Sequence, residues 1–331
     1  MDDRKASILQ AVVEAYIETA QPVGSGVIAR DPKMDVSAAT IRNEMAALER
    51  EGYLTQPHTS AGRIPTDAGY RFFVDQIGSS GPGRLSDVDA RRVRTFFDHA
   101  RGEIEQRLGA TSRLLADMTD YAAVVVGPSR DPARIRSVEL VELVPGHLLV
   151  VAVLSDGAIV KQHLTVEDAS AERIAAAGQA LRESLIGGPL ADLPTIHPSS
   201  DPAVDTLAAL ARDAVAEPVA GLVYVGGASR MAGQFEAIET VRRVLAILEE
   251  QLLVVTLLSD LVNRGLSVAI GSETGLEPLS ECSVVVAPYQ VEGEEAGTIG
   301  LLGPTRMDYP KALATVAVVS RRLGRSLEAG A

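Results

Sequence analysis

The sequence predicts an α+β protein with more than one domain. Its 331 residues, at roughly 150 residues per domain, give about two or three domains. Apolar residues recur at helical spacing in residues 1–76, whereas from residue 122 onward short valine-rich runs alternate with helical segments. The composition, 46% hydrophobic and 23% charged with no Trp, is that of a globular chain whose core is built from Val, Leu, Ile and Ala.

Three helices are predicted in the first 52 residues. In the first helix, apolar side chains recur at three- and four-residue steps: Ile8, Leu9, Val12, Val13, Tyr16 and Ile17. Pro22–Ser25 interrupts it, with Ser25 expected as the N-cap of a short helix that runs to Ala29. Ser37 is expected to cap a third helix that ends near Gly52, a residue suited to a left-handed C′ position. The inward face of this third helix is predicted to be Ile41, Met45 and Leu48.

A β-hairpin and a fourth helix are predicted next. Tyr53–Gln56 is strand-like, Pro57–Gly62 consists of turn residues, and Arg63–Pro65 returns as the second strand. Thr66 is expected to cap a helix, and Gly78–Gly83 has the composition of a linker.

The remaining residues predict a mixed α/β region. A charged amphipathic helix is expected over about 86–118. Strands are expected over 122–126, 137–144, 147–154, 221–225, 268–270, 282–287 and 298–302. Helices are expected over 169–186, 203–216 and 236–264 and from Lys311 onward.

Three helices followed by a hairpin is the layout of a winged helix-turn-helix, whose third helix enters a major groove. In that arrangement Ala39, Thr40, Arg42, Asn43 and Ala46 point outward or sideways. Arg and Asn are the side chains that make bidentate contacts to guanine and adenine. Ser25 and Ser37 suit phosphate oxygens. The hairpin segment Thr55–Thr66 contains no acid. Its His58, Thr59, Ser60 and Arg63 are therefore candidates for contacting the DNA backbone or a minor groove.

Charge leaves a second interpretation open. The chain has a net charge of −13, and residues 1–76 carry 8 basic against 11 acidic residues. Glu44, Glu49 and Glu51 oppose DNA binding unless they face away from the duplex, and Arg42 is also suited to pairing with a helical Glu. On pattern alone, the N-terminal unit is as compatible with protein contacts as with DNA.

Longer motifs at both ends of the chain resemble the heat-inducible transcription repressor family HrcA. The N-terminal motifs are Gln21–Ser25, Val36–Met45, Gly52–Leu54 and Gln56–Thr66. The C-terminal motifs are Ile270–Glu273, Cys282–Val285, Ala287–Tyr289, Gly297–Gly300 and Gly303–Pro310. The middle of the chain, about 165–235, resembles the family only weakly.

The resemblance implies a winged helix-turn-helix DNA-binding domain at 1–76, a linker at 77–94, a GAF-like α/β domain at 95–165 and 236–331, and an inserted α/β dimerisation domain at 166–235. It also implies a cytoplasmic homodimer that represses chaperone operons at an inverted-repeat operator called CIRCE in double-stranded DNA. Release on heat stress and support from the GroEL chaperonin belong to the same expectation. The alternative is a GAF-like regulator that senses a small ligand and does not act on DNA directly.

The sequence predicts neither an enzyme nor a cofactor or metal site. It contains no Walker A, G-x-S-x-G or H-E-x-x-H pattern, and its five histidines are scattered. The single cysteine, Cys282, adjoins a run of valines and is expected to be buried and inert. Arg306, Asp308 and Tyr309 are interpreted as a structured corner. No apolar run reaches the roughly 18 residues of a membrane span, and no signal peptide is recognised at Met1–Lys5.

Overall fold

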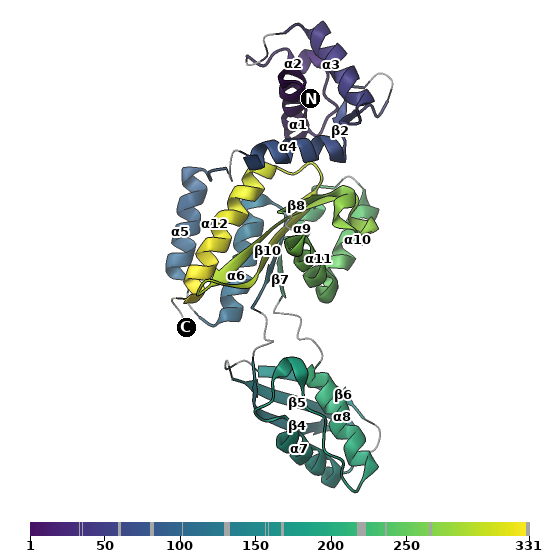
Figure 1. Cartoon of the computed structure of the whole chain (residues 1–331), viewed down its shortest axis with the longest axis vertical. Helices are drawn as coiled ribbons and strands as arrows, with labels where there is room; N and C mark the ends of the chain where they lie inside the picture. The colour runs from purple at the N-terminus through teal and green to yellow at the C-terminus, as the bar shows by residue number, and fades with distance from the viewer. Residues whose placement is uncertain are drawn as a thin grey trace. The chain divides into compact units, whose positions relative to one another are not determined.

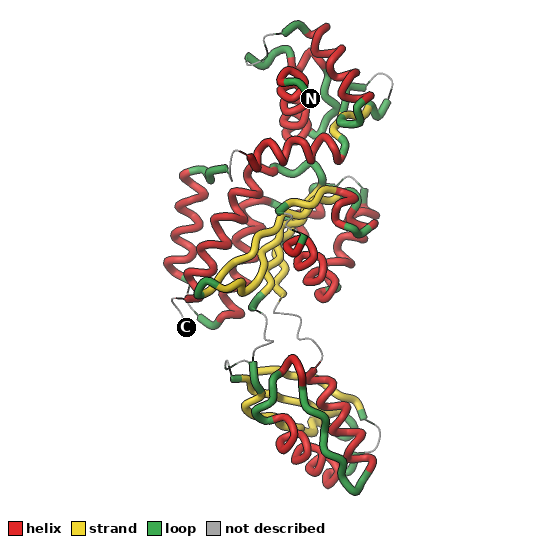
Figure 2. Tube along the Cα trace, in the orientation of Figure 1, coloured by secondary structure: helices red, strands yellow, loops and turns green. Residues whose placement is uncertain are grey.

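The computed structural model describes residues 1–32, 34, 36–58, 61–79, 83–100, 102–128, 133–155, 157, 159–166, 169–216, 223–235, 237–264 and 267–328. The chain divides into two compact units. The first unit combines Met1–Gly127 with Val223–Ala331, and the second is Pro128–Leu222. Both contain helices and antiparallel sheet, which confirms the α+β class (Figures 1 and 2). None of the described helices has the length and apolar character needed to cross a bilayer.

The first unit begins with a small helical body, Asp3–Ser79, called the head below. Its elements are α1 (Asp3–Thr19), α2 (Ser25–Ile28), α3 (Ala38–Arg50), β1 (Leu54–Thr55), β2 (Ile64–Pro65) and α4 (Asp67–Ser79). Its buried residues include Ile8, Leu9, Val12, Val13, Ile28, Ile41, Met45, Leu48 and Leu54. The two strands pair in antiparallel register, Leu54 with Pro65 and Thr55 with Ile64, so the predicted hairpin is confirmed.

The predicted limits of α3 are confirmed at both ends. The Ser37 side-chain oxygen accepts a hydrogen bond from the Thr40 backbone N–H at 3.2 Å, as an N-cap does. Gly52 has φ +84°, which is the left-handed conformation that glycine adopts at little cost. The predicted cap of α2 is wrong. Gly24 occupies the N-cap position and Ser25 is the first helical residue, so α2 begins one residue earlier than predicted.

The rest of the first unit is a sheet with helices on both faces, called the central body. The strand order is β7-β3-β10-β9-β8, with every neighbouring pair antiparallel. The strands are β3 (Ala122–Val126), β7 (Val223–Gly226), β8 (Val268–Ile270), β9 (Cys282–Val291) and β10 (Glu294–Pro304). All five residues of β3 are buried, which is why this strand reads as an uninterrupted apolar run.

Two groups of helices cover this sheet (Figure 1). On one face lie α6 (Ile104–Thr119) and α12 (Tyr309–Glu328), with α5 (Asp87–His99) packed against α12. On the other lie α9 (Ala228–Ala232), α10 (Ile238–Glu249) and α11 (Gln251–Asn263). Two short 3₁₀ helices, η2 (Gly271–Thr274) and η3 (Glu277–Leu279), connect β8 to β9.

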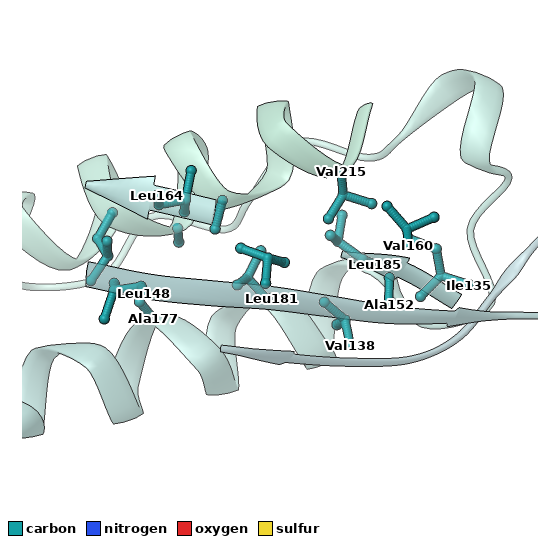
Figure 3. Packing of buried hydrophobic residues seen from close by; sticks show 14 of the residues in the cluster. Ile135, Val138, Leu148, Ala152, Val160, Leu164, Ala177, Leu181, Leu185 and Val215 are labelled. Carbon is teal, nitrogen blue, oxygen red and sulfur yellow. The ribbon is translucent and has the colours of Figure 1, made fainter. Parts of the chain in front are cut away.

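The second unit is a three-stranded sheet covered on one face. It contains β4 (Ile135–Val144), β5 (His147–Leu154), β6 (Ile159–Thr165), α7 (Ala171–Leu185), η1 (Leu190–Asp192) and α8 (Pro202–Ala216). Alternate residues of β5 join the core with Leu181 of α7 and Val215 of α8 (Figure 3). The intervening residues of β5, Leu149, Val151 and Val153, are only half-buried and lie on the opposite face.

Several predicted boundaries are wrong. The single helix expected over 86–118 is two helices, α5 and α6, with Gly102 between them at φ +112°. The linker expected at 77–94 is shorter, because α4 continues to Ser79 and α5 begins at Asp87. Strand β6 was not predicted, although the Asp156-Gly157 pair before its alternating polar and apolar residues is a typical hairpin turn motif.

The expected insertion at 166–235 also has the wrong limits, because the compact second unit spans Pro128–Leu222. Strands β4, β5 and β6 hydrogen-bond only with one another among the described strands, so they cannot belong to the sheet of the central body. Strand β7 was misassigned in the opposite direction: its residues were predicted to belong to the insertion, but it pairs with β3 of the central body.

Candidate nucleic-acid interface

Helix α3 turns one side into the head and leaves the other in solvent. Ile41, Met45 and Leu48 are buried at 0–1% exposure, as predicted. The opposite side carries residues at i, i+4, i+7 and i+11, which lie in one row along a helix. This row, called the α3 outer row, consists of Ala39, Asn43, Ala46 and Arg50. Two of its four side chains are methyl groups, so another molecule can approach the helix backbone closely there.

The polar side chains of this surface are exposed. Asn43 and Arg50 lie in the α3 outer row, and Arg42 lies beside it. Within the described residues, neither Arg42 nor Arg50 has a carboxylate partner, although the Arg50 Nε–H donates to the Ala46 carbonyl oxygen at 3.3 Å. The alternative in which Arg42 pairs with a helical Glu therefore finds no support in the described residues. Amide and guanidinium groups are thus presented to solvent together.

The acids of α3 are directed elsewhere. Glu49 accepts hydrogen bonds from the Arg63 guanidinium at 2.9 Å, and Glu51 forms an ion pair with Lys5 at 2.5 Å. The hydrogen bond to Glu51 raises the pKa of the Lys5 ammonium, and the charge of Glu44 acts in the same direction. None of the three carboxylates thus lies in the α3 outer row. DNA binding requires Glu44, Glu49 and Glu51 to face away from the duplex, and a duplex bound at the outer row would meet that requirement.

Arg63 connects parts of the head. Its backbone exchanges two hydrogen bonds of 2.9 Å with Val23, in the turn between α1 and α2. Gly62 precedes it so close to that turn that an added Cβ would lie 2.5 Å from the Val23 carbonyl. With its side chain held by Glu49, Arg63 fixes the base of the hairpin to both α3 and the turn. The Arg63 side chain is half-buried, with 16% of its surface accessible, whereas Arg42 and Asn43 are exposed.

The other predicted site residues lie around α3 in different settings. Ser37 is exposed and Thr40 half-buried, and their hydroxyl oxygens lie 3.0 Å apart. Ser25 is half-buried at the start of α2, and His58 is exposed in the hairpin segment. Thr59 and Ser60 lie outside the described residues.

One residue of this surface was missed. Arg50 was not a predicted site residue, yet it continues the α3 outer row seven residues after Asn43. The signal was present as helical spacing: the prediction placed Ala46 on the outward side but did not extend that side one turn further to Arg50.

The predictions for Cys282 and for the corner near residue 308 are confirmed. Burial raises the pKa of the Cys282 thiol to about 12, so it stays protonated and unreactive at neutral pH. Three contacts hold this corner. The Asp308 backbone N–H donates a hydrogen bond to the Tyr121 hydroxyl, and the Arg306 guanidinium donates one to the Gln234 carbonyl. The Tyr309 hydroxyl lies 2.7 Å from that of Ser283.

Comparison with known proteins agrees with the motifs. Residues 105–313 match the model of the HrcA protein C-terminal domain. A heat-inducible transcription repressor HrcA from Moorella thermoacetica is 38% identical, covering 99% of this chain and 98% of its own length. That of Nocardia farcinica is also 38% identical, covering 98% and 97%. A crystal structure titled as that of a hypothetical protein has the same fold over the full length of both chains, with a TM-score of 0.68 at 23% identity. The chain therefore belongs to the HrcA family of heat-inducible transcription repressors.

Proposed function

We propose that the head is a winged helix-turn-helix domain that binds operator DNA through the α3 outer row. The observation that carries this proposal is the separation of charge on α3: Arg42, Asn43 and Arg50 are exposed, while the three carboxylates lie to the sides. In this proposal Asn43 and Arg42 contact base edges in the major groove, with Thr40 beside the row at the start of the helix. Ala39 allows the helix to approach closely, and Arg50 contacts a phosphate.

Backbone contacts come from the residues around α3. We propose that Ser25, Ser37 and His58 contact phosphate oxygens, and the proposal extends to Thr59 and Ser60 of the same hairpin segment. Arg63 has a different role from the one expected. Because Glu49 holds its guanidinium, it acts mainly by fixing the hairpin segment, and it reaches DNA only when that ion pair opens.

We further propose that the chain works as a homodimer on an inverted repeat, with a GAF-like central body and dimerisation through the second unit. The support is the open face of the three-stranded sheet. Val141 and Ile159 are 44% and 51% exposed there, beside the half-buried Leu149, Val151 and Val153. By register Glu139, Lys161 and His163 lie on the same face, and exposed apolar side chains bordered by polar ones are typical of a protein contact surface. Two heads related by a two-fold axis match a repeat of opposite orientation.

The cellular role follows from family membership. We propose that the dimer represses chaperone operons in the cytoplasm at a CIRCE-type repeat, is released on heating, and regains activity with the help of the GroEL chaperonin. Heating the purified chain through heat-shock temperatures, with and without chaperonin, tests the last step. Full operator binding after heating without chaperonin would contradict it.

DNA recognition is tested by selection from a pool of random duplexes with the wild-type chain. We expect enrichment of an inverted repeat, bound at least about 10³-fold more tightly than a scrambled duplex. Equal affinity for both duplexes would contradict the proposal and favour the interpretation in which the head binds protein.

Dimerisation is tested by sedimentation of Val151→Asp, which places a charge on the open sheet face. We expect this variant to be monomeric at concentrations at which the wild type is dimeric. Ala176→Asp, on the exposed side of α7, is the matched control and should remain dimeric. A dimeric Val151→Asp variant would exclude this face as the interface.

A further inference from the structure

Helix α4 has two sets of contacts. One side packs against α1 of the head, and the other meets the central body near β8 and η2. The residues on the central-body side come from two of the C-terminal motifs that no predicted function explained: Ile270–Glu273 and the segment that ends at Pro310. Residues distant in sequence therefore meet at α4.

Arg71 makes the most specific of these contacts. Its Nε–H donates to one carboxylate oxygen of Glu273 at 2.9 Å, and a terminal N–H donates to the other. The same terminal nitrogen also donates to the Val268 carbonyl at 2.8 Å. The Glu273 carboxylate is fixed in turn by the Ile270 backbone N–H at 2.9 Å. Paired hydrogen bonds between planar groups restrict rotation as well as distance, so this contact defines an orientation.

Asp67 and Tyr70 extend the contact by one turn of α4. The Asp67 carboxylate accepts a hydrogen bond from the Ser272 backbone N–H at 3.3 Å. Any side chain at Gly271 would overlap that carboxylate. The Tyr70 ring, only 2% exposed, lies 5.9 Å from the ring of the fully buried Tyr309. Contacts at Asp67, Tyr70 and Arg71, within little more than one turn of the helix, thus hold α4 on the central body.

We propose that Asp67, Tyr70 and Arg71, together with Gly271–Glu273 and Tyr309, are positioning residues that fix the head on the central body. We call this set the α4 joint. It follows that the central body, and not the linker after α4, sets the direction in which the α3 outer row points. In a dimer the α4 joint then determines the half-site spacing that both heads can bind at once. This last consequence rests on the proposed DNA-binding function.

The joint itself is tested without DNA. Cysteines introduced at the exposed Gln10 and Arg321 carry spin labels, and labelled chain is diluted into unlabelled chain so that pulsed EPR reports one head-to-body distance. Cys282 is buried and does not compete for the label. We expect one narrow distance distribution in the wild type and a broad one in Arg71→Gln and in Asp67→Ala. Arg71→Lys, which keeps the charge, should broaden it less.

Two matched variants serve as controls. Tyr70→Phe keeps the ring that lies near Tyr309 and removes only a buried hydroxyl with no hydrogen-bond partner among the described residues, so it should leave the distribution narrow. Arg92→Gln breaks an ion pair with Asp117 inside the central body and should also have no effect. Narrow distributions in both Arg71→Gln and Asp67→Ala would overturn the proposal.

The consequence for DNA is tested with the repeat selected by the wild type, in duplexes whose spacer is lengthened or shortened by one to five base pairs. Simultaneous binding of two rigidly held heads gains about 10²–10⁴-fold over one head. We expect wild-type affinity to fall by at least about tenfold when the spacer changes, and the affinity of Arg71→Gln to vary much less. Affinity for a single half-site should be unchanged, which a merely unfolded variant would not show.

The two arms separate the possible failures. If the wild type selects no sequence, the proposed function fails while the EPR measurement still decides on the joint. If Arg71→Gln keeps the wild-type dependence on spacer length although its distance distribution broadens, the joint exists but does not set the spacing, and that part of the proposal is wrong.

Discussion

Helices α3 and α4 are both 13 residues long and belong to the same head, yet their polar side chains contact different surroundings. On α3, Arg42, Asn43 and Arg50 face solvent without carboxylate partners among the described residues. On α4, Asp67 and Arg71 bind the central body. The difference shows that charge and helical spacing alone do not identify a recognition helix. What distinguishes α3 is that Arg63 and Lys5 pair with Glu49 and Glu51, while Arg42 and Arg50 have no carboxylate partner in the part of the chain that the structure describes.

The largest effect is expected for Gly69→Ala on α4. Alanine favours helix, but a Cβ at this position would overlap the backbone carbonyl of Tyr53, which accepts a hydrogen bond from the Thr66 N–H. We expect a loss of about 3 kcal/mol in the free energy of unfolding, measured by denaturant titration. Gly78→Ala, on the same helix with open space around the Cβ, is the control and should be neutral or slightly stabilising. Equal stability of the two variants would show that α4 is not closely packed.

On α3 a substitution should change recognition and leave stability unaffected. Asn43→Ala removes an exposed amide, so we expect the difference in binding free energy between operator and scrambled duplex to shrink by about 1–3 kcal/mol. The melting temperature should stay within error of the wild type. Competition binding against both duplexes measures the first quantity. An unchanged preference for the operator would remove Asn43 from the proposed interface.

A smaller effect is expected at the start of α3. Ser37→Ala removes the side-chain cap of the Thr40 N–H, so the head should lose about 1 kcal/mol of stability. Ser37→Asp keeps the capping oxygen and should retain stability while weakening DNA binding through its charge. If both variants weaken DNA binding equally, Ser37 contributes to binding through its hydroxyl rather than through the cap.

The smallest effect is expected for Glu49→Gln, which releases Arg63. A partly exposed ion pair contributes about 0.5 kcal/mol, so stability should change little. Binding to any duplex should tighten, and the slope of log affinity against log salt should steepen by up to about one unit. Arg63→Ala in the Glu49→Gln background should reverse that gain. A salt slope that stays the same in Glu49→Gln would mean that Arg63 does not reach DNA.

Local signals predicted most of the head. The caps at Ser37 and Gly52, the inward side of α3 and the hairpin are each determined by a few neighbouring residues, and all were found. Arg63 shows the limit of this approach. Its place in an acid-free hairpin suggested a DNA contact, but Glu49 lies 14 positions away and is brought to it only by the fold.

Long-range pairing explains the remaining differences. Residues 135–165 show the apolar pattern of strands, and strands of the two units have similar patterns. A short stretch of sequence therefore does not indicate which sheet a strand will join. The same reason hid the α4 joint, because Arg71 and Glu273 are separated by 202 positions. The motif Ile270–Glu273 was visible in the sequence, whereas its contact with Arg71 was not.

The position at which the second unit is inserted has a separate consequence. The chain leaves the central sheet after β3 and returns at β7, and the last residue of β3, Val126, is the register partner of the first residue of β7, Val223. Paired residues of antiparallel strands lie about 5 Å apart, a gap that a tight turn closes. We therefore expect that the whole Pro128–Leu222 segment can be removed or replaced without changing the pairing of β3 with β7. An ancestral or engineered chain lacking it would retain an intact β3–β7 hairpin, and another module could be grafted at the same point without disturbing the sheet.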